Sequence, residues 1–455
     1  MIAPLLLFSS FLIFYSLTII VLDKREIISG DSVHALLTTV SLIKDHDLNL
    51  KNNYDRKDYE AFYHTPLPDR QIWTNTKGEE LPLHPPGLSI LLMPAYALAQ
   101  RLGAELFMGF LTALLVLNLF LLVKQVTSSD KTALIVSTIL GFSAPIIYFS
   151  PQIYREIPVA LIFVFSVRQI LDWSKTATWK ILLTGFLLAF IPWLHTKYLI
   201  SSLPLIGVVL FLQRNDLKKN LLQNPKLLSF ILPTVFSLLA IIYFYLFNYG
   251  SLLAAGTGNA NEQFIGFPLA GWFGMLLDQK KGLFFNAPIY ILAFLGIALH
   301  YNKLKRETLI IMAIFLPQYL LSGLHHSWDD WSPPDRYLTA FVPLLAVYLG
   351  YFFIEFKKGW PRILFWLLAV ISIVISLFSL FAVDWQEFYA LIGPNVFLGN
   401  FPLLESLELW RLFPSFLGEG YKFTSSWIKA FFLLIILSFS CYLLKRSKND
   451  SVKNS

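Results

Sequence analysis

Long apolar runs alternate with short polar segments along nearly the whole chain. The runs approach the roughly 20 residues that a helix needs to cross the hydrocarbon core of a bilayer. They lie at residues 3–22, 104–124, 132–149, 157–172, 179–194, 198–213, 227–248, 283–300, 307–323, 336–354, 363–383 and 425–444. This pattern predicts an all-α polytopic membrane protein with about 12 transmembrane helices.

The lysines and arginines indicate how the runs are oriented. If the N-terminus is cytoplasmic, every loop on that side is short and basic, as expected for cytoplasmic loops. The segments 23–103, 249–282 and 384–424 then face outward, and 445–455 is a basic cytoplasmic tail. Within the long first outer segment, 88–100 is apolar but short, which predicts an interfacial helix. Most acidic residues fall on the outer side, so we expect the polar chemistry there.

Composition supports the membrane class. Of the 455 residues, 56% are hydrophobic and 14% are charged, whereas a soluble domain carries roughly 25% charged residues. The net charge of +7 resides in short clusters between apolar runs, which is typical of topology signals and not of nucleic-acid binding. Cys441 is the only cysteine, so no internal disulfide can form. Residues 1–455 are interpreted as a single integral membrane domain.

Asp31 follows the first run by nine residues and is the first candidate catalytic residue. A carboxylate at the surface of a membrane could act as a general base on a lipid-borne substrate. His34 lies three residues further and would share its helix face, where it could tune the acid. The alternative is a simple helix-capping acid.

Glu156 is the second candidate acid, and Pro158 follows it at a position that suits the first turn of a helix. The carboxylate would then lie at the positive end of that helix. It stays near the surface, where it avoids the cost of roughly 2.5–3.5 kcal/mol for a charge at the bilayer centre. The alternatives are a cap or a salt bridge with Arg155.

A dense polar loop at residues 325–337 precedes the run 336–354. Pro334 predicts a helix start that leaves Arg336 in the first turn, where backbone N–H groups and a guanidinium would suit a phosphate. The candidates for holding a divalent metal are Glu156, His325, His326, Asp329 and Asp330. Their spacing matches no defined ligand pattern, so ordinary solvated polar residues are the alternative.

Three lysines on the outer side run against the general charge pattern. Lys280 and Lys281 precede the run 283–300, and Lys197 interrupts the segment 179–213. Each could meet an anionic head group. Alternatively, the paired lysines balance nearby acids, and Lys197 extends its ammonium to the interface.

In this order, the features resemble the GT-C superfamily of integral membrane glycosyltransferases. They are most similar to the group of protein O-mannosyltransferases, lipid A aminoarabinose transferases and Rgt-like bacterial proteins. Four matches carry the resemblance: Gly30-Asp31; His84-Pro85-Pro86-Gly87-Leu88; Arg155-Glu156-Ile157-Pro158; and Gly282-Leu283-Phe284 with the later Pro333-Pro334-Asp335-Arg336-Tyr337.

The resemblance implies a sugar donor on a polyprenyl phosphate and inversion at the anomeric carbon. Asp31 would take the proton of the acceptor hydroxyl, and Glu156 would orient the acceptor or support a metal. The implied donor phosphate-binding residues are Arg336, Lys280, Lys281 and Lys197, with His34, His84, Asp335 and Tyr337 in support. No cofactor is implied with certainty, although a divalent metal is compatible with the acids.

The leading prediction is therefore a transferase that modifies a glycan, lipid or protein of the cell envelope. It would work on the extracytoplasmic side of the plasma or inner membrane, with the bilayer and the lipid-linked sugar as partners and no nucleic acid. A transporter or flippase of lipid-linked sugars is the alternative. A transporter would favour charges near mid-span and an internal repeat, and the sequence shows neither. A polymerase or ligase of polysaccharides would share the outward acids.

Overall fold

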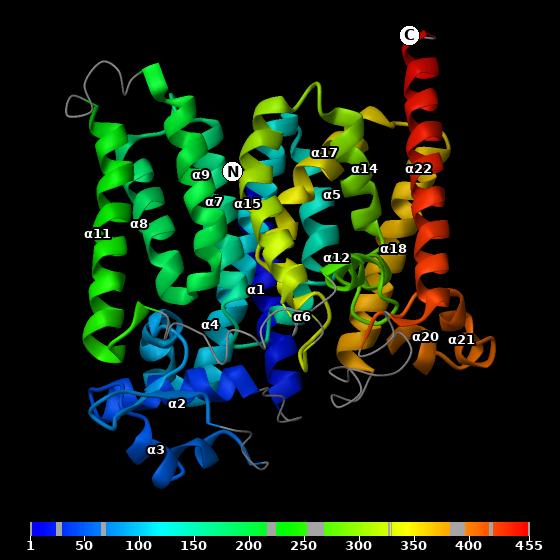
Figure 1. Cartoon of the computed structure of the whole chain (residues 1–455). Coiled ribbons are helices and arrows are strands. Elements are labelled where there is room, and N and C mark those ends of the chain that lie inside the picture. The colour runs from blue at the N-terminus through cyan, green and yellow to red at the C-terminus, as the bar shows by residue number, and fades with distance from the viewer. Residues whose placement is uncertain are drawn as a thin grey trace. The chain divides into compact units, whose positions relative to one another are not determined.

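The computed structural model shows a predominantly helical chain (Figure 1). It describes residues 2–23, 30–64, 70–215, 224–252, 268–325, 328, 330–382, 396–417 and 422–453. Two metal candidates from the sequence, His326 and Asp329, lie outside these residues, as do parts of the segments 23–103, 249–282, 384–424 and 445–455.

Six helices in the described part of the chain are long and apolar enough to cross a membrane. They include the stretches Ile2–Leu22, Gly87–Thr127, Pro225–Tyr249, Lys305–Leu324, Trp360–Phe381 and Thr424–Arg446. Shorter apolar helices lie at Thr178–Leu194, Thr196–Leu212, Ile289–His300 and Val342–Glu355. The predicted multi-pass helical membrane protein is thus confirmed in its class, while the total of about 12 spans stays a prediction.

The internal contacts of the chain group into two compact units. Unit 1 comprises Met1–Phe8, Val116–Phe149 and Asn261–Ser455, and unit 2 comprises Ser9–Leu115 and Ser150–Ala260. Each unit is described by itself below. The single integral domain expected from the sequence stays a prediction.

Unit 2 contains the first polar segment, which holds short helices and one hairpin. The helical elements are α2 (Gly30–Lys44), α3 (Lys51–Asp55) and η1 (Asp58–Ala61). The strands β1 (Ile72–Thr74) and β2 (Glu80–Pro82) pair antiparallel, with Trp73 opposite Leu81. This small sheet corrects the all-α prediction. Asn75 and Gly78 close its turn, and Gly78 has a φ of 78°, which glycine adopts without steric cost.

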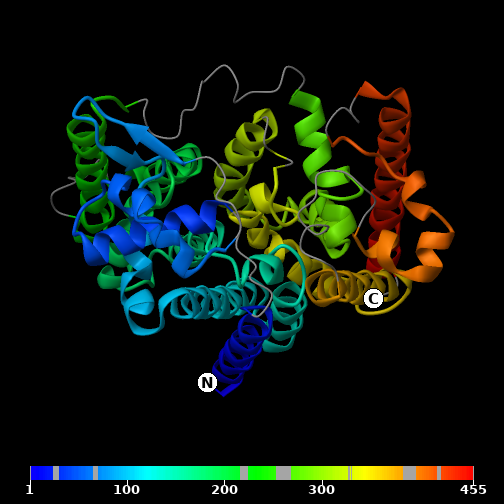
Figure 2. The same ribbon diagram turned by 90° about the horizontal axis from the view of Figure 1, so that it is seen from below.

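The hairpin is attached to a long membrane helix of the same unit. That helix, α11 (Pro225–Tyr249), starts with Asn224 as its N-cap, whose side chain accepts from the N–H of Leu227. At its other end, the Tyr249 hydroxyl donates to the carbonyl of Pro82 at 2.7 Å. Leu81 packs there against Tyr245 and Tyr249. Figure 2 shows the two strands beside this end of α11.

The other helices of unit 2 surround the site residues. They are α7 (Glu156–Leu171), α8 (Thr178–Leu194), η2 (Thr196–Tyr198) and α9 (Leu199–Leu212). The predicted interruption near His195–Lys197 is confirmed, since the helix breaks there into α8 and α9. Helix α2 runs across the direction of α8 and α11, not along it (Figure 1).

Two helices, α1 (Ile2–Asp23) and α4 (Gly87–Thr127), have residues in both units. Helix α4 is interrupted at Ala99 and Gln100, whose backbone angles are not helical. The break separates the apolar stretch predicted as an interfacial helix over 88–100 from the span predicted over 104–124. A short helix precedes the break, and the interfacial helix predicted over 88–100 stays a prediction.

In unit 1, prolines divide three of the predicted spans. The run 132–149 forms α5 (Asp130–Gly141) and α6 (Ile146–Phe149), with a cis peptide bond at Ala144–Pro145. The run 283–300 forms α13 (Leu283–Asn286) and α14 (Ile289–His300). The run 336–354 forms α16 (Arg336–Thr339), η6 (Val342–Leu345) and α17 (Ala346–Glu355). Proline lacks the N–H of a helix interior, so the prediction of continuous helices was wrong there.

The remaining elements of unit 1 are membrane helices and short outer helices. They are α12 (Pro268–Leu277), α15 (Lys305–Leu324), α18 (Trp360–Phe381), α20 (Val396–Asn400), α21 (Pro402–Ser406), η7 (Leu409–Leu412) and α22 (Thr424–Lys453). Helix α14 packs against α17, α18 and α22, while α12 packs against α15. Glycines permit these close approaches: a Cβ on Gly271 would collide with the backbone of Gly323.

Candidate active site

Asp31 lies in the first turn of α2, where the helix dipole favours a carboxylate. Its Oδ1 accepts a hydrogen bond from Nε2 of Gln71 at 3.1 Å. Its Oδ2 lies 3.5 Å from Nη1 of Arg155, and the Asp31 side chain keeps 15% of its surface exposed. Each oxygen of the Asp31 carboxylate thus has a partner, and part of the side chain stays accessible to a substrate.

Arg155 belongs to the candidate site, although the sequence analysis did not single it out as a site residue. It precedes α7 and was considered as a salt-bridge partner of its neighbour Glu156, but the structure pairs it with Asp31. Its side chain is only 6% exposed. A cation buried to this degree requires a partner, but its burial is visible only in the structure, so the sequence held no signal for this pair.

Glu156 begins α7, as predicted, and its side chain is almost fully buried. Its Oε1 lies 3.4 Å from the Nζ of Lys197. Lys197 comes from η2, the short turn between α8 and α9, and its ammonium also lies over the ring of Tyr198. The break in the predicted 179–213 span therefore brings a cation to the second acid.

Two histidines lie close to these ion pairs. The rings of His84 and His195 have centroids 5.0 Å apart. Nδ1 of His195 accepts a hydrogen bond from the backbone N–H of Lys197 at 3.2 Å, so its proton is on Nε2. Burial, followed by the charges of Lys197, His84 and Arg155, lowers the pKa of His195 well below its usual value. His195 is therefore neutral at pH 7.

The turn that carries His84 is held by a close backbone contact. A Cβ on Gly87 would collide with the carbonyl of Trp193, near the end of α8. Glycine is needed at this position for that reason. The Pro85-Pro86-Gly87 sequence thus places His84 beside the end of α8.

His34 is buried and its Nδ1 lies 2.7 Å from the hydroxyl of Tyr54. Burial lowers the pKa of His34 to about 4, against a smaller opposing effect from the charge of Asp31. The imidazole is neutral at pH 7, so it would influence Asp31 as a dipole and not as a charge. Its supporting role stays a prediction.

This lowered pKa predicts a pH dependence of stability. The unfolded chain protonates His34 below pH 6.5, whereas the folded chain protonates it only near pH 4. The stability that neutral His34 contributes is complete above pH 6.5 and is lost as the pH falls to about 4. As the pH falls through this window, the free energy of unfolding should decrease more steeply in the wild type than in His34→Gln. The difference between the two slopes should reach up to about 1.4 kcal/mol per pH unit.

The measurement is the melting temperature of the detergent-solubilised protein across that pH range. His64→Gln serves as the control, because His64 belongs to the same polar segment and is exposed. Its curve is compared with that of the wild type, to show the effect of exchanging an exposed histidine of this segment for glutamine. A parallel curve for His34→Gln would show that the buried imidazole does not titrate as stated.

In unit 1, the structure brings together most of the predicted cationic residues. Lys281 is buried, and its Nζ donates to the carbonyl of Asp330 at 3.2 Å and also to the carbonyl of Ser332. Nη1 of Arg336 lies 2.7 Å from Oδ2 of Asp330. These contacts connect the turn before α13 to the polar loop before α16.

The buried Asp278 carboxylate shapes the turn that carries both lysines. Its Oδ1 accepts from the backbone N–H groups of Lys280 and Lys281 at 2.8 and 2.9 Å. Its Oδ2 accepts from the N–H of Phe416 at 2.7 Å. Asp278 was not among the residues singled out from the sequence, although its place two residues before a pair of lysines was the available signal.

The helix that begins at Arg336 is shorter than predicted. Helix α16 has a single turn of four residues, and Asp335 precedes it in a left-handed conformation with a φ of 66°. Aspartate tolerates this region better than most residues. A helix dipole of useful size is therefore missing at Arg336, and a phosphate there would be bound by side chains. Tyr337 contributes its ring, which lies beside Arg336 and His325.

Asp335 itself is buried, and burial raises the pKa of its carboxyl well above the usual value, against the opposing charge of Lys281. Within the part of the chain that the structure describes, neither carboxylate oxygen has a hydrogen-bond partner. The acid is therefore neutral or closely balanced by Lys281. Its predicted supporting role is not tested.

Of the five metal candidates, His326 and Asp329 lie outside the described residues, and the other three do not form a metal site with their described neighbours. Among the described residues, no three His, Cys, Asp or Glu side chains lie close enough together to hold one. Asp31, Glu156 and Asp330 each face a cationic side chain, which repels a metal ion. No step below is routed through a metal.

Solved structures show which fold this arrangement belongs to. The chain aligns with ArnT from Cupriavidus metallidurans bound to undecaprenyl phosphate, with a TM-score of 0.50 and 11% identity over 82% of this chain and 64% of that one. The chain has the GT-C fold. The fold that the sequence resemblance implied is thereby confirmed.

Further solved structures with the same type of fold align more weakly. The oligosaccharyltransferase of Archaeoglobus fulgidus in its apo form gives a TM-score of 0.46 and 14% identity over 89% of this chain and 59% of that one. The archaeal oligosaccharyltransferase AglB with an inhibitory peptide and a dolichol-phosphate gives 0.44 and 13% over the same shares. The chain spans less than two thirds of the length of these proteins. No family model and no curated protein matches the sequence.

Proposed function

We propose that this chain is a membrane glycosyltransferase that moves a hexosyl or pentosyl group from a polyprenyl-phosphate donor to a cell-envelope acceptor. The acceptor is a glycan, a lipid or a protein, and the reaction takes place on the extracytoplasmic side of the plasma or inner membrane. The observation that carries the proposal is two ion pairs in unit 2, Asp31–Arg155 and Glu156–Lys197, which come from neighbouring positions at the start of α7. The GT-C fold, and the undecaprenyl phosphate bound to ArnT, support the class of donor.

The chemistry requires a base and a leaving phosphate. Asp31 accepts the proton of the acceptor hydroxyl while the oxygen attacks the anomeric carbon. The new carbon–oxygen bond forms as the bond from that carbon to the phosphate oxygen breaks, and the phosphate leaves with the electron pair. Attack from the side opposite the leaving group inverts the anomeric centre. The proton ends on Asp31 and then passes to water.

The contacts of Asp31 suit this task. Gln71 and Arg155 approach its two different oxygens, so the carboxylate is held in one orientation. A cation at this distance favours the charged form of an acid, which is the form that accepts a proton. The remaining 15% of exposed side-chain surface is where an acceptor hydroxyl would approach.

Glu156 and Lys197 would act on the acceptor, so that Lys197, which the sequence analysis assigned to the donor phosphate, takes a different role in this proposal. Their ion pair adjoins the site from the next outer segment, and both groups are largely buried. A fixed pair of this kind can accept from one sugar hydroxyl and donate to another. His84 and the neutral His195 lie beside this pair and would add further polar contacts.

Arg336, Lys280 and Lys281 are proposed to contact the phosphate of the donor. A fixed cation stabilises the charge that develops on a departing phosphate, most strongly where water is excluded. Arg336 shares its guanidinium with Asp330, and Lys281 is engaged with two carbonyls. Lys280 is the most deeply buried of the three.

The experiment uses the full chain in phospholipid nanodiscs with a panel of polyprenyl-phosphate sugars and a cell-envelope extract as acceptor. The expected result is donor-dependent transfer of labelled sugar and release of polyprenyl phosphate. The competing transporter hypothesis predicts movement of intact lipid-linked sugar across sealed vesicles without release of the lipid phosphate. That outcome would reject the transferase.

A further inference from the structure

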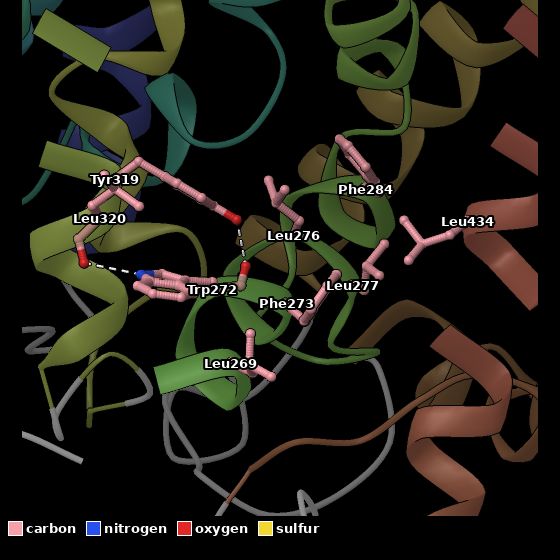
Figure 3. A pocket seen from close by; sticks show the side chains of 9 residues that line it. All are labelled: Leu269, Trp272, Phe273, Leu276, Leu277, Phe284, Tyr319, Leu320 and Leu434. Atoms are coloured by element: carbon pink, nitrogen blue, oxygen red, sulfur yellow. Dashed lines mark hydrogen bonds between the residues drawn. The ribbon is translucent and has the colours of Figure 1, made fainter. Parts of the chain in front are cut away.

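An apolar pocket of about 260 Å³ lies within unit 1 (Figure 3). Its wall consists of five leucines, two phenylalanines, Trp272 and Tyr319. These side chains come from α12, α13, α15 and α22. Nothing in the proposed chemistry uses this pocket.

The two polar groups in the wall are occupied by backbone partners. Nε1 of Trp272 donates to the carbonyl of Leu320 at 2.9 Å, and the hydroxyl of Tyr319 donates to the carbonyl of Trp272 at 2.5 Å (Figure 3). The nine lining side chains therefore offer a ligand hydrocarbon surface. A polar guest would lose its hydrogen bonds to water without replacement, so the pocket suits an apolar one.

The pocket is accessible from the hydrocarbon core of the membrane. Helices α15 and α22 both have the length and composition of spans. Leu320 of α15 and Leu434 of α22 line the pocket and are 41% and 38% exposed. A lipid chain can therefore enter from the side, between two membrane helices.

A cationic turn interrupts the wall of the pocket. Leu277 ends α12 and Phe284 belongs to α13, and both line the pocket. Between them lies the turn in which Asp278 fixes Lys280 and Lys281 by their backbone N–H groups. An apolar chain in the pocket would thus end beside two lysines, an arrangement that fits a lipid with a phosphate at its head.

We propose that this pocket binds the isoprene units of the donor that lie next to its phosphate. The inference rests on the proposed function, because it takes the donor to be a polyprenyl phosphate. A dry cavity of about 150 Å³ with such a lining accommodates benzene, so 260 Å³ has room for roughly two five-carbon units. The pocket would then select the lipid carrier, and the acids of unit 2 would not depend on it.

The first test is binding without catalysis. The probe is a polyprenyl phosphate that carries a diazirine in its first isoprene units and no sugar, in nanodiscs of plain phospholipid. Photolabelling should map to α12, Phe284, α15 near Leu320 and α22 near Leu434. Excess unlabelled polyprenyl phosphate should abolish this labelling, and excess phospholipid should not.

The second test fills the pocket. Leu320→Trp should raise the KM for a long-chain donor at least about tenfold, because the chain loses the burial of several methylene groups. The KM for the acceptor should stay unchanged. Leu316→Trp is the matched control, since Leu316 lies one turn earlier on α15, is 51% exposed and does not line the pocket. Leu434→Trp and its control Ile436→Trp repeat the comparison on α22.

The outcomes separate this inference from the proposed function. Pocket labelling without any transfer would keep the lipid site and reject the transferase. Transfer with labelling elsewhere, or with equal KM values in Leu320→Trp and Leu316→Trp, would reject the pocket and keep the transferase. Labelling that phospholipid competes away would show a general lipid site and would overturn the inference.

Discussion

Asp31→Asn should lower kcat for sugar transfer by about 100- to 10,000-fold, the usual contribution of a general base. Asparagine preserves the size of the side chain and can still accept from Gln71, but it cannot take the proton of the acceptor hydroxyl. Binding of the lipid donor should change little, because the substitution removes no contact to it. The measurement is the steady-state rate with labelled donor, together with donor binding to the variant.

The matched control is Asp55→Asn, which makes the same change at an acid of the same polar segment. Asp55 is 55% exposed and pairs with Arg70, and its variant should transfer sugar at the wild-type rate. If Asp31→Asn also transfers at that rate, Asp31 is not the base. A second variant tests whether activity is lost only because the protein fails to fold. It combines Asp31→Asn with Arg155→Met and so removes both charges of the pair. This double variant should fold well and remain inactive.

The positions of the membrane helices could be predicted well from the sequence, and their continuity could not. Hydropathy reports which residues avoid water, and the apolar runs 227–248, 307–323 and 363–383 each correspond to one helix. It does not report backbone hydrogen bonds. Runs that hydropathy treats as continuous are divided near Pro145, Pro288 and Pro343. Pro233 and Pro317 lie inside the unbroken helices α11 and α15, so a proline in a run does not by itself show where a helix ends.

Some features of the candidate site could likewise be predicted from the sequence, and others could not. The start of α7 at Glu156 could be predicted because a proline in the first turn is a local signal. The partner of Arg155 could not, because Asp31 is far away in the sequence and only tertiary packing selects it over the adjacent Glu156. The β-hairpin was also missed: its strands have three residues each, too few for a period-2 pattern to stand out.

Arg155→Met should lower the free energy of unfolding by about 3 kcal/mol, near the lower end of the range for breaking a buried ion pair. The value is not larger because Asp31 remains 15% exposed and retains the hydrogen bond from Gln71. Methionine fills most of the space of the arginine stem, so the cost comes from the unpaired carboxylate and not from a cavity. Thermal unfolding in detergent measures the loss.

A double-mutant cycle with Asp31→Asn isolates the pair. The double variant should be more stable than Arg155→Met alone, because neither charge is left buried without its partner. Arg70→Met is the control: Arg70 is 41% exposed and joins Asp55 to Glu80, and loss of such a surface pair costs under about 1 kcal/mol. If Arg155→Met is no more costly than Arg70→Met, the Arg155–Asp31 contact does not hold the site together. The orientation of Asp31 would then have to come from its other contacts, among them the hydrogen bond from Gln71.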